Sequence, residues 1–304
     1  MKVGIKQLTQ CVVILLKTST TPKKDWLWMI ASIFLTVLRN PNSILDRSKK
    51  ESKKQFLSDY LPHRITVRGQ DGILFMARPK YEDLARFLFA RIVAKWEPLS
   101  VINPNENEVI IDVGANVGYY TLRLAPKVGK NGKIIAIEPD PESCELLGIN
   151  CKLNSLSNVE IHNIAIADKT GDVVLYQSRT HSGTNSIFTN SFSDLESNRL
   201  TVKSTTLDNL LGEKYNAIDW IKIDVEGAEL AVLRGSPKTL KITKNILIEV
   251  HEHILKLNNE RPECVLEILK NNGFRITLIN DNWDSETSPN QTLKCDYILG
   301  EKSS

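Results

Sequence analysis

The stretch from Val109 to Gly118 constrains the fold of this chain more than any other. It reads VIIDVGANVG, a short β-branched run followed by an acid and by two glycines four residues apart. Such a run is typical of a buried parallel strand, and the apolar spacing from Tyr119 to Ala125 predicts a helix after it. The glycines therefore mark a strand-to-helix elbow, where backbone N–H groups can approach a nucleotide-type cofactor closely.

The residues around the elbow distinguish two kinds of cofactor. The dinucleotide fingerprint G-x-G-x-x-G is incomplete, because Asn116 stands between Gly114 and Gly118. An acid just before the elbow, Asp112, can hold a cationic cofactor through charge-assisted hydrogen bonds. A second acid, Glu138, follows the predicted strand 133–137 and could accept both hydroxyls of a ribose. Singly, these acids could also be a helix cap and a strand-end residue, but together they favour S-adenosylmethionine over NAD.

A third segment carries the most specific pattern. Residues 220–230 read WIKIDVEGAEL, an apolar strand that ends in carboxylates and opens a helix. With the elbow, this segment resembles the FkbM family of class I methyltransferases, whose marks are D-x-G-A-N-x-G and K-x-D-x-E-G-A-E. The resemblance is close from about residue 105 to about 250 and looser from about 64 to about 300. Asn116 is expected in this family, and asparagine adopts left-handed geometry more readily than most residues.

The resemblance implies a doubly wound, Rossmann-like sheet of seven strands with an antiparallel last strand, and S-adenosyl-L-methionine as the cofactor. It also implies that Asp168 lies near the adenine, although a turn residue before Gly171 is an equal interpretation of Asp168. The predicted cofactor-binding residues are Asp112, Gly114, Asn116, Gly118, Glu138 and Asp168.

Methyl transfer needs an aligned acceptor and a base that removes its proton. The candidates for this base are Asp224, Glu226 and His251. The pattern places Asp112, Glu138, Asp168, Asp224 and His251 at the carboxyl ends of strands, where ligands bind in such sheets, and Glu226 at the start of a helix. Lys222 sits inside an apolar strand, so we expect it either to hold a carboxylate such as Asp224 or to be a solvated edge residue. Glu229 is explained by the helix dipole, which favours acids at a helix start.

The segment Glu249-Val250-His251-Glu252-His253 raises a metal hypothesis, because Glu249, His251 and His253 would share one strand face. Three ligands from one short strand rarely converge on one ion, and zinc sites usually draw on separated elements. We therefore predict no metal and prefer His251 as a residue that orients or deprotonates the acceptor.

Alternating strand and helix patterns predict the doubly wound sheet within residues 106–304, with a β insertion at about 172–203. Further strands are predicted at 159–165, 218–223, 245–250, 275–279 and 295–299, and helices at 141–153 and 262–271. Residues 55–105 are predicted to form a hairpin and a helix, Tyr81 to Trp96, that cover the cofactor pocket.

The N-terminal extension, residues 1–54, holds 11 Lys or Arg against three acids, whereas the rest holds 28 against 33. Residues 26–38 are almost uncharged but too short to span a bilayer, and no signal-peptide cleavage pattern follows them. Two hypotheses remain for this extension: an anchor on an anionic membrane surface, or a hydrophobic helix packed on the core. Nucleic acid is not an expected partner.

Five scattered cysteines without C-x-x-C spacing favour a reducing, cytoplasmic compartment, with peripheral attachment at the inner membrane face if the anchor hypothesis holds. The sequence thus predicts a methyltransferase. By resemblance its acceptor is a hydroxyl oxygen, on a glycan, a lipid-linked saccharide or another small metabolite. The alternatives are a nicotinamide-dependent sugar oxidoreductase and a non-catalytic, membrane-associated binding module.

Overall fold

The computed structural model of the 304-residue chain describes residues 65–68, 71–77, 98–178, 185–188, 197–279, 293 and 295–302. The chain divides into two compact units, Met1–Trp96 and Glu97–Ser304. In the first unit, β1 (Ile65–Arg68) and β2 (Leu74–Ala77) form an antiparallel hairpin. The predicted helix Tyr81 to Trp96 and the extension 1–54 lie outside the described residues.

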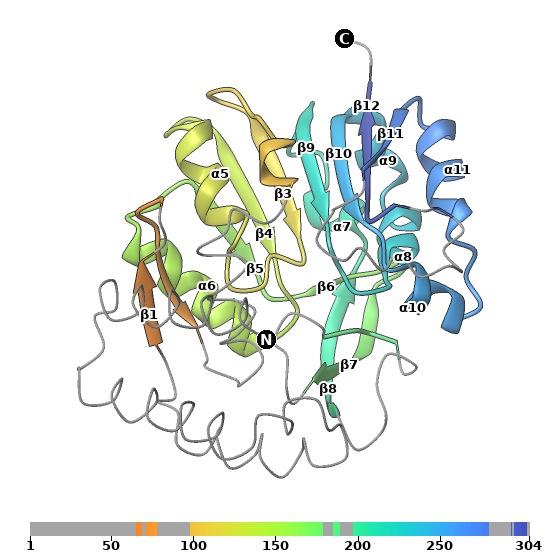
Figure 1. The fold of residues 1–304 in the computed structure, drawn as a ribbon, viewed down its shortest axis with the longest axis horizontal. Helices are drawn as coiled ribbons and strands as arrows, with labels where there is room; N and C mark the ends of the chain where they lie inside the picture. Colours follow the sequence, from red (N-terminus) through yellow and green to blue (C-terminus); the bar gives the residue numbers. More distant parts are fainter. Residues whose placement is uncertain are drawn as a thin grey trace, which may run out of the picture. The chain divides into compact units, whose positions relative to one another are not determined.

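The second unit is built on a seven-stranded sheet (Figure 1). Its strands, in spatial order, are β11 (Arg275–Ile279), β12 (Tyr297–Glu301), β10 (Thr243–Glu249), β9 (Ile218–Ile223), β3 (Val109–Val113), β4 (Lys133–Ile137) and β5 (Val159–His162). β12 runs antiparallel to both of its neighbours, and the other adjacent pairs are parallel. This order confirms the predicted class I arrangement with an antiparallel last strand.

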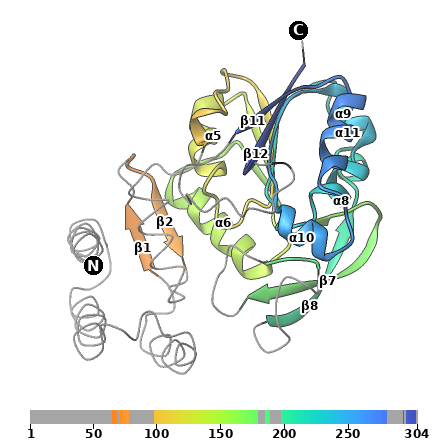
Figure 2. The ribbon, with the colours of Figure 1, turned by 45° about the vertical axis from the view of Figure 1, so that its right-hand side comes forward.

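Helices cover both faces of this sheet, with α5 and α6 on one side and α8, α9 and α11 on the other (Figure 2). Within the described residues the helices, in chain order, are η4 (Pro98–Ser100), α5 (Thr121–Val128), α6 (Pro141–Leu153), α7 (Leu207–Leu211), α8 (Glu229–Arg234), α9 (Pro237–Ile242), α10 (Glu252–Leu257) and α11 (Glu263–Asn271). The bounds of α6 match the prediction. It starts there because Asp140 accepts the Glu142 N–H and because proline fits a first helical turn.

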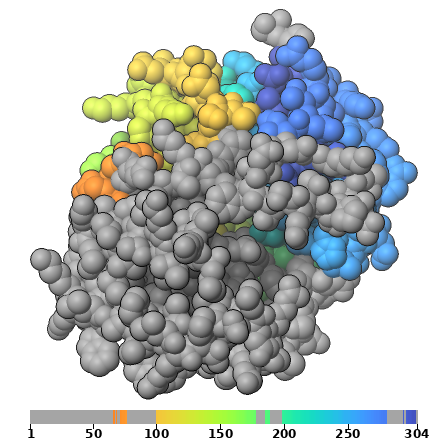
Figure 3. Space-filling view, viewed as in Figure 1, coloured from red at the N-terminus to blue at the C-terminus, as the bar shows by residue number. Residues whose placement is uncertain are grey.

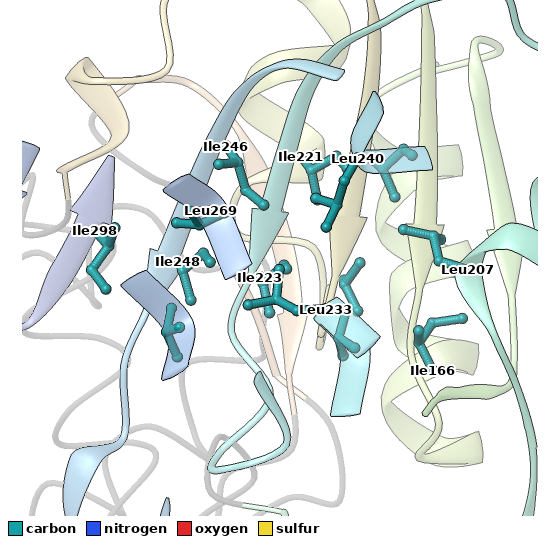
Figure 4. Close-up of a cluster of buried hydrophobic side chains, with 14 of the residues drawn as sticks. Ile166, Leu207, Ile221, Ile223, Leu233, Leu240, Ile246, Ile248, Leu269 and Ile298 are labelled. Carbon is teal, nitrogen blue, oxygen red and sulfur yellow. The ribbon is translucent and has the colours of Figure 1, made fainter. Parts of the chain in front are cut away.

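The main hydrophobic core lies between the sheet and the helices α7, α8, α9 and α11. Ile223 of β9 lies beside Leu233 of α8, Ile221 lies beside Leu240 of α9, and β10 adds Ile246 and Ile248 (Figure 4). Burying each such side chain contributes about 1.5–3 kcal/mol. All six residues of β9 are buried, including Lys222, so this central strand carries a cation into the core.

A second, three-stranded sheet has the order β6 (Ala165–Ile166), β8 (Ser197–Thr205), β7 (Gly171–Ser178). The prediction of one strand over 159–165 is therefore wrong, because the segment is split between the two sheets. Asn163 lies at the break, and its side-chain amide donates to the carbonyl oxygens of Glu138 and Pro139 at 2.8 and 3.0 Å. That side chain ties the end of β5 to the end of β4, at the point where the chain leaves the main sheet.

On the surface, the C-terminal elements, in blue, lie beside elements from the part of the chain near β3, in yellow (Figure 3). The sheet thus brings together segments that are distant in sequence. In the part of the chain that the structure describes, no helix has the length and apolar content needed to cross a membrane.

Candidate functional site

The elbow after β3 lies at the point where the strand order of the sheet reverses. β3 is flanked by β4, the next strand of the sheet in the chain, and by β9, which follows more than a hundred residues later. Ligands of open α/β sheets bind at such points, beyond the carboxyl ends of the strands. Gly114 packs so closely on the end of β9 that a Cβ there would overlap the carbonyl oxygen of Asp224. The elbow and the end of β9 therefore form one continuous surface.

The backbone of the elbow is left-handed at three positions. The φ angles of Gly114, Asn116 and Gly118 are +77°, +49° and +102°. The prediction that Asn116 takes a left-handed conformation is thus confirmed. Gly118 also has a packing role, since a Cβ there would lie 2.7 Å from Leu147 Cδ1 on α6.

The backbone N–H groups of the elbow are already used inside the protein. Those of Gly114 and Ala115 both donate to the Ile137 carbonyl oxygen at 3.0 Å, and that of Gly118 donates to the Ala115 carbonyl oxygen at 2.9 Å. The Asn116 N–H donates to Glu138 Oε2 at 2.8 Å, and the next N–H donates to the Asn116 side chain at 2.7 Å. A pyrophosphate needs free N–H donors, so this elbow suits a cofactor held by carboxylates better than a dinucleotide.

Glu138 is the carboxylate best placed for a ribose. It follows β4, is 6% exposed, and accepts the N–H of Asp140 on Oε1 at 2.8 Å and that of Asn116 on Oε2. Each oxygen keeps a lone pair for a further donor such as a ribose hydroxyl. Burial raises the pKa of Glu138 to about 7, although the two backbone hydrogen bonds lower it. Its charge state therefore changes near neutral pH.

Asp112 lies beneath the elbow, with no exposed surface. Its Oδ2 accepts the hydroxyl of Thr121 at 2.6 Å, and its Oδ1 lies 3.4 Å from Lys222 Nζ. Both oxygens of Asp112 thus face groups of the protein, whereas direct binding of a cationic cofactor requires an oxygen that faces the ligand. Asp112 therefore orders the elbow and faces a protein cation, while its direct contact with the cofactor stays a prediction.

Lys222 links the two acids on either side of the elbow. Its side chain is 5% exposed, and its Nζ lies 3.4 Å from Asp112 Oδ1 and 3.3 Å from Asp224 Oδ2. It also donates to the Gly114 carbonyl oxygen at 3.2 Å and lies 4.8 Å from the centre of the Tyr120 ring. Lys222 is therefore a buried residue that holds carboxylates, and not a solvated residue at the edge of the sheet.

His251 lies among carboxylates that follow two adjacent strands. Its Nδ1 is 2.7 Å from Glu229 Oε1, and its Nε2 is 3.3 Å from Glu226 Oε2 and 3.9 Å from Glu249 Oε1. Burial lowers the pKa of His251, but these three carboxylates outweigh it and hold the pKa well above its usual value. The structure thus brings His251 together with Glu226, and with Asp224 nearby.

Asp224, Glu249 and His251 each place one donor atom within 4.8 Å of the other two. The three-ligand group of the metal hypothesis does not form, because His253 is exposed on α10. Both ring nitrogens of His251 already face carboxylates, so a cation would have to replace one of these contacts. The prediction of a site without a metal remains a prediction.

Asp168 is not brought to this site by the main sheet. It follows β6, which pairs with β8 in the second sheet, so its expected position at the end of a main-sheet strand is wrong. Asp168 is exposed, and it adds weakly to the raised pKa of Arg234, which is due first to the Glu260 hydrogen bonds. Its role at the adenine stays an untested prediction.

A polar loop of the β insertion, residues 185–188, joins two parts of the site. The sequence did not reveal this connection. Asn185 donates to Asp140 Oδ2 at 3.0 Å, and Ser186 Oγ donates to the Glu226 carbonyl oxygen at 2.7 Å. Ser186 is also held by a two-way backbone bridge to Tyr176 of β7. Residues 185–188 therefore connect the start of α6 with the turn after β9. The signal was the run of Ser and Asn residues, which is common to loops of many kinds.

The sheet order and the acid-lined elbow define a class I methyltransferase. The chain belongs to the FkbM methyltransferase family, since the model of the methyltransferase FkbM domain matches residues 112–276, more than half of the chain. S-adenosyl-L-methionine is the methyl donor of this class, so the predicted cofactor is confirmed. The nicotinamide alternative is set aside.

Similar proteins include methyltransferases from a fungus, an archaeon and a bacterium. Methyltransferase sdnD of Sordaria araneosa is 27% identical over 242 residues, covering 70% of this chain and 90% of that protein. Hexuronic acid methyltransferase AglP of Haloferax volcanii is 27% identical, covering 65% and 72%. The 2-O-methyltransferase NoeI of Sinorhizobium fredii is 27% identical, covering 53% and 70%.

Proposed function

We propose that this methyltransferase transfers a methyl group to a hydroxyl oxygen of a glycan, a lipid-linked saccharide or another small metabolite. The observation that carries the proposal is the position of His251, whose ring lies among carboxylates at the ends of β9 and β10, next to the elbow. A histidine in such a place can take the proton of a hydroxyl. Two relatives support an oxygen or sugar acceptor by name, the 2-O-methyltransferase NoeI and the hexuronic acid methyltransferase AglP.

The elbow would hold the donor in the following way. Glu138 would accept the two ribose hydroxyls on the lone pairs that its backbone hydrogen bonds leave free. Gly114, Asn116 and Gly118 give the elbow its left-handed path, and Asp112 with Lys222 holds it against the end of β9. Asp224 lies at that end and is 18% exposed, whereas Asp112 is fully buried, which makes Asp224 the more accessible acid of this arrangement.

When bound, S-adenosyl-L-methionine supplies a sulfonium methyl group: the acceptor oxygen bonds to this carbon as the S–CH₃ bond breaks, the electron pair of that bond stays on sulfur, and the O–H proton passes to a base. The base would be His251, with Asp224 or Glu226 able to accept a hydrogen bond from the acceptor and orient it. Lys222 holds Asp224 for this task at 3.3 Å. The protein thus aligns the hydroxyl and removes its proton.

The charge of the site favours a neutral acceptor over an anionic one. Asp224, Glu226 and Glu249 all follow or end the strands beside His251, so three carboxylates lie close to one another, with Lys222 beside Asp224 and His251 beside Glu226 and Glu249. A carboxylate acceptor would be repelled by this group at short range. We therefore expect a methyl ether on a hydroxyl rather than a methyl ester, even if the sugar is a uronic acid.

The proposal is tested with the full chain, donor labelled in its methyl group, and a panel of neutral sugars, uronic acids, amines and phenols. The expected product is labelled on oxygen and keeps its label in mild alkali, which cleaves esters but not ethers. The variant H251N should bind S-adenosylhomocysteine like the unmodified protein yet transfer little label. Label found only on nitrogen or in an alkali-labile ester would contradict the proposal.

A membrane setting is proposed from the sequence alone. The basic segment 1–54 would place the chain on an anionic surface of the cytoplasmic side, where lipid-linked saccharides are accessible. Flotation with vesicles that contain anionic lipid tests this. Equal recovery of the full chain and of a chain without residues 1–54 would reject the anchor.

A further inference from the structure

Glu229, the first residue of α8, is completely buried and contacts the ring of His251. Its Oε1 lies 2.7 Å from His251 Nδ1 and accepts the Gly227 N–H at 3.0 Å. The helix-dipole explanation for Glu229 needs only a solvated carboxylate near a helix start, and α8 has just six residues. Complete burial against an imidazole indicates a different role.

The way Glu229 is buried is costly for folding. Its Oε2 is buried and accepts no hydrogen bond from the residues that the structure describes. A buried carboxylate with an unsatisfied oxygen costs free energy that an apolar side chain of similar size would not. Such a group calls for an explanation beyond stability, and its short contact with Nδ1 supplies one.

We propose that Glu229 is a positioning residue that holds His251 with Nδ1 as the hydrogen-bond donor, so that Nε2 serves as the proton acceptor in methyl transfer. The inference rests on the proposed function. In a neutral imidazole one nitrogen carries the proton and the other the lone pair, and the partner of the first decides which is which. With Nδ1–H directed to Glu229, the lone pair is on Nε2, on the side of Glu226 and Glu249.

The charged groups around His251 come from three elements. They are Glu229 on α8, Glu226 in the turn after β9 and Glu249 at the end of β10, with Asp224 close by. Burial lowers the pKa of His251, but these carboxylates together raise it, so the neutral base becomes more available as the pH rises. Removing the charge of Glu229 should free the base at a lower pH but leave the ring without its fixed tautomer.

The test compares E229Q with the unmodified chain by ¹⁵N NMR of the histidine ring nitrogens, with H251N used to assign the signals. In the unmodified chain we expect neutral His251 to carry its proton on Nδ1. In E229Q we expect the pKa of His251 to fall by about 1–3 units, because an opposing charge within hydrogen-bond distance is lost, and the two tautomers to mix. The matched control is E263Q, which removes an acid from the first turn of α11 and should leave His251 unchanged.

Kinetics provide the second readout. In E229Q the acidic limb of the kcat profile should move to lower pH while the plateau falls, with the KM for the donor unchanged. A loss of stability alone would move neither the limb nor the ring pKa. An unchanged ring pKa and pH profile in E229Q would overturn the inference.

One outcome does not depend on E229Q folding. If neutral His251 in the unmodified chain carries its proton on Nε2, the inference is wrong. Failure of the proposed function is a separate result, seen as no methyl transfer to any acceptor by the unmodified chain, whereas the ring measurement needs neither donor nor acceptor.

Discussion

The N–H of Asn116 donates to Glu138 Oε2 at 2.8 Å, which ties the elbow after β3 to the end of β4. Since the other N–H groups of the elbow are also used internally, the ligand must be recognised mainly by side chains. Burial raises the pKa of Glu138 to about 7, so this side chain changes charge near neutral pH. Its titration therefore gives the first prediction.

Affinity for S-adenosylhomocysteine should rise with pH from about 6 to about 8. Burial raises the pKa of Glu138 to about 7, and the ionised form accepts ribose hydroxyls better than the neutral acid, so binding below pH 7 must release a proton. The affinity should fall by up to about tenfold for each pH unit below the pKa. Calorimetry in buffers of different ionisation enthalpy measures both the affinity and the released proton.

The variant E138Q should bind weakly and without this pH dependence, whereas E142Q, an exposed acid in the first turn of α6, should behave like the unmodified chain. In the unliganded chain, the free energy of unfolding should change with pH in the opposite direction to the affinity. Because the folded pKa of about 7 exceeds the unfolded value of 4.5, its free energy of unfolding should decrease as the pH rises between these values. A pH-independent affinity in the unmodified chain would refute the prediction.

Replacing Lys222 with methionine should lower the free energy of unfolding by about 3–5 kcal/mol, since it leaves Asp112 buried without its cation. The double variant K222M/D112N should recover part of this loss, because the unpaired charge is gone. Denaturant unfolding of both single variants and the double variant measures the coupling. Strict additivity would show that Lys222 and Asp112 do not interact.

The exposed pair Lys203 and Asp172, 2.8 Å apart, provides the control for this cycle. Such surface pairs contribute at most about 1 kcal/mol. K203M should therefore change stability little. A loss as large as that of K222M would mean that burial is not the cause.

Alanine at Gly114 should abolish donor binding and destabilise the fold. The position has a φ of +77°, and the added Cβ would overlap the carbonyl oxygen of Asp224. The left-handed backbone conformation alone costs a residue with a Cβ about 1–2 kcal/mol. The control is G171A, since no atom lies within 4 Å of a Cβ at Gly171. Thermal unfolding with and without S-adenosylhomocysteine measures both effects, and normal ligand stabilisation of G114A would argue against the elbow as the binding site.

Removal of metals should leave methyl transfer unchanged. Asp224, Glu249 and His251 bring donor atoms within 4.8 Å of one another, but both ring nitrogens of His251 face carboxylates. Activity is measured after dialysis against a chelator and again after adding magnesium, manganese or zinc. A loss that one of these ions restores would replace the His251 base with a metal-assisted mechanism.

Much of the fold could be predicted because its signals are local. The strand 133–137 and the helix 141–153 follow from the spacing of apolar residues, and the left-handed Asn116 follows from the glycine-spaced turn. The sheet order came from the family resemblance rather than from these patterns. Local chemistry thus predicted the elements, and the resemblance predicted their arrangement.

The rest depended on contacts between distant segments. The apolar run 159–165 gives no sign that β6 pairs with β8, and that pairing is what moves Asp168 away from the main sheet. An acid such as Glu229 fits the start of a helix whether or not it has a partner. Its contact with His251 could be seen only once the structure placed α8 beside the end of β10. Neither feature can be read from residue spacing.

Calorimetric titration of the purified full chain with S-adenosylhomocysteine, and separately with NAD, tests the central claim that the acids at this elbow hold a sulfonium donor. We predict saturable binding of S-adenosylhomocysteine that E138Q weakens strongly, and no binding of NAD. Binding of NAD in place of S-adenosylhomocysteine, or S-adenosylhomocysteine binding that E138Q leaves intact, would contradict it.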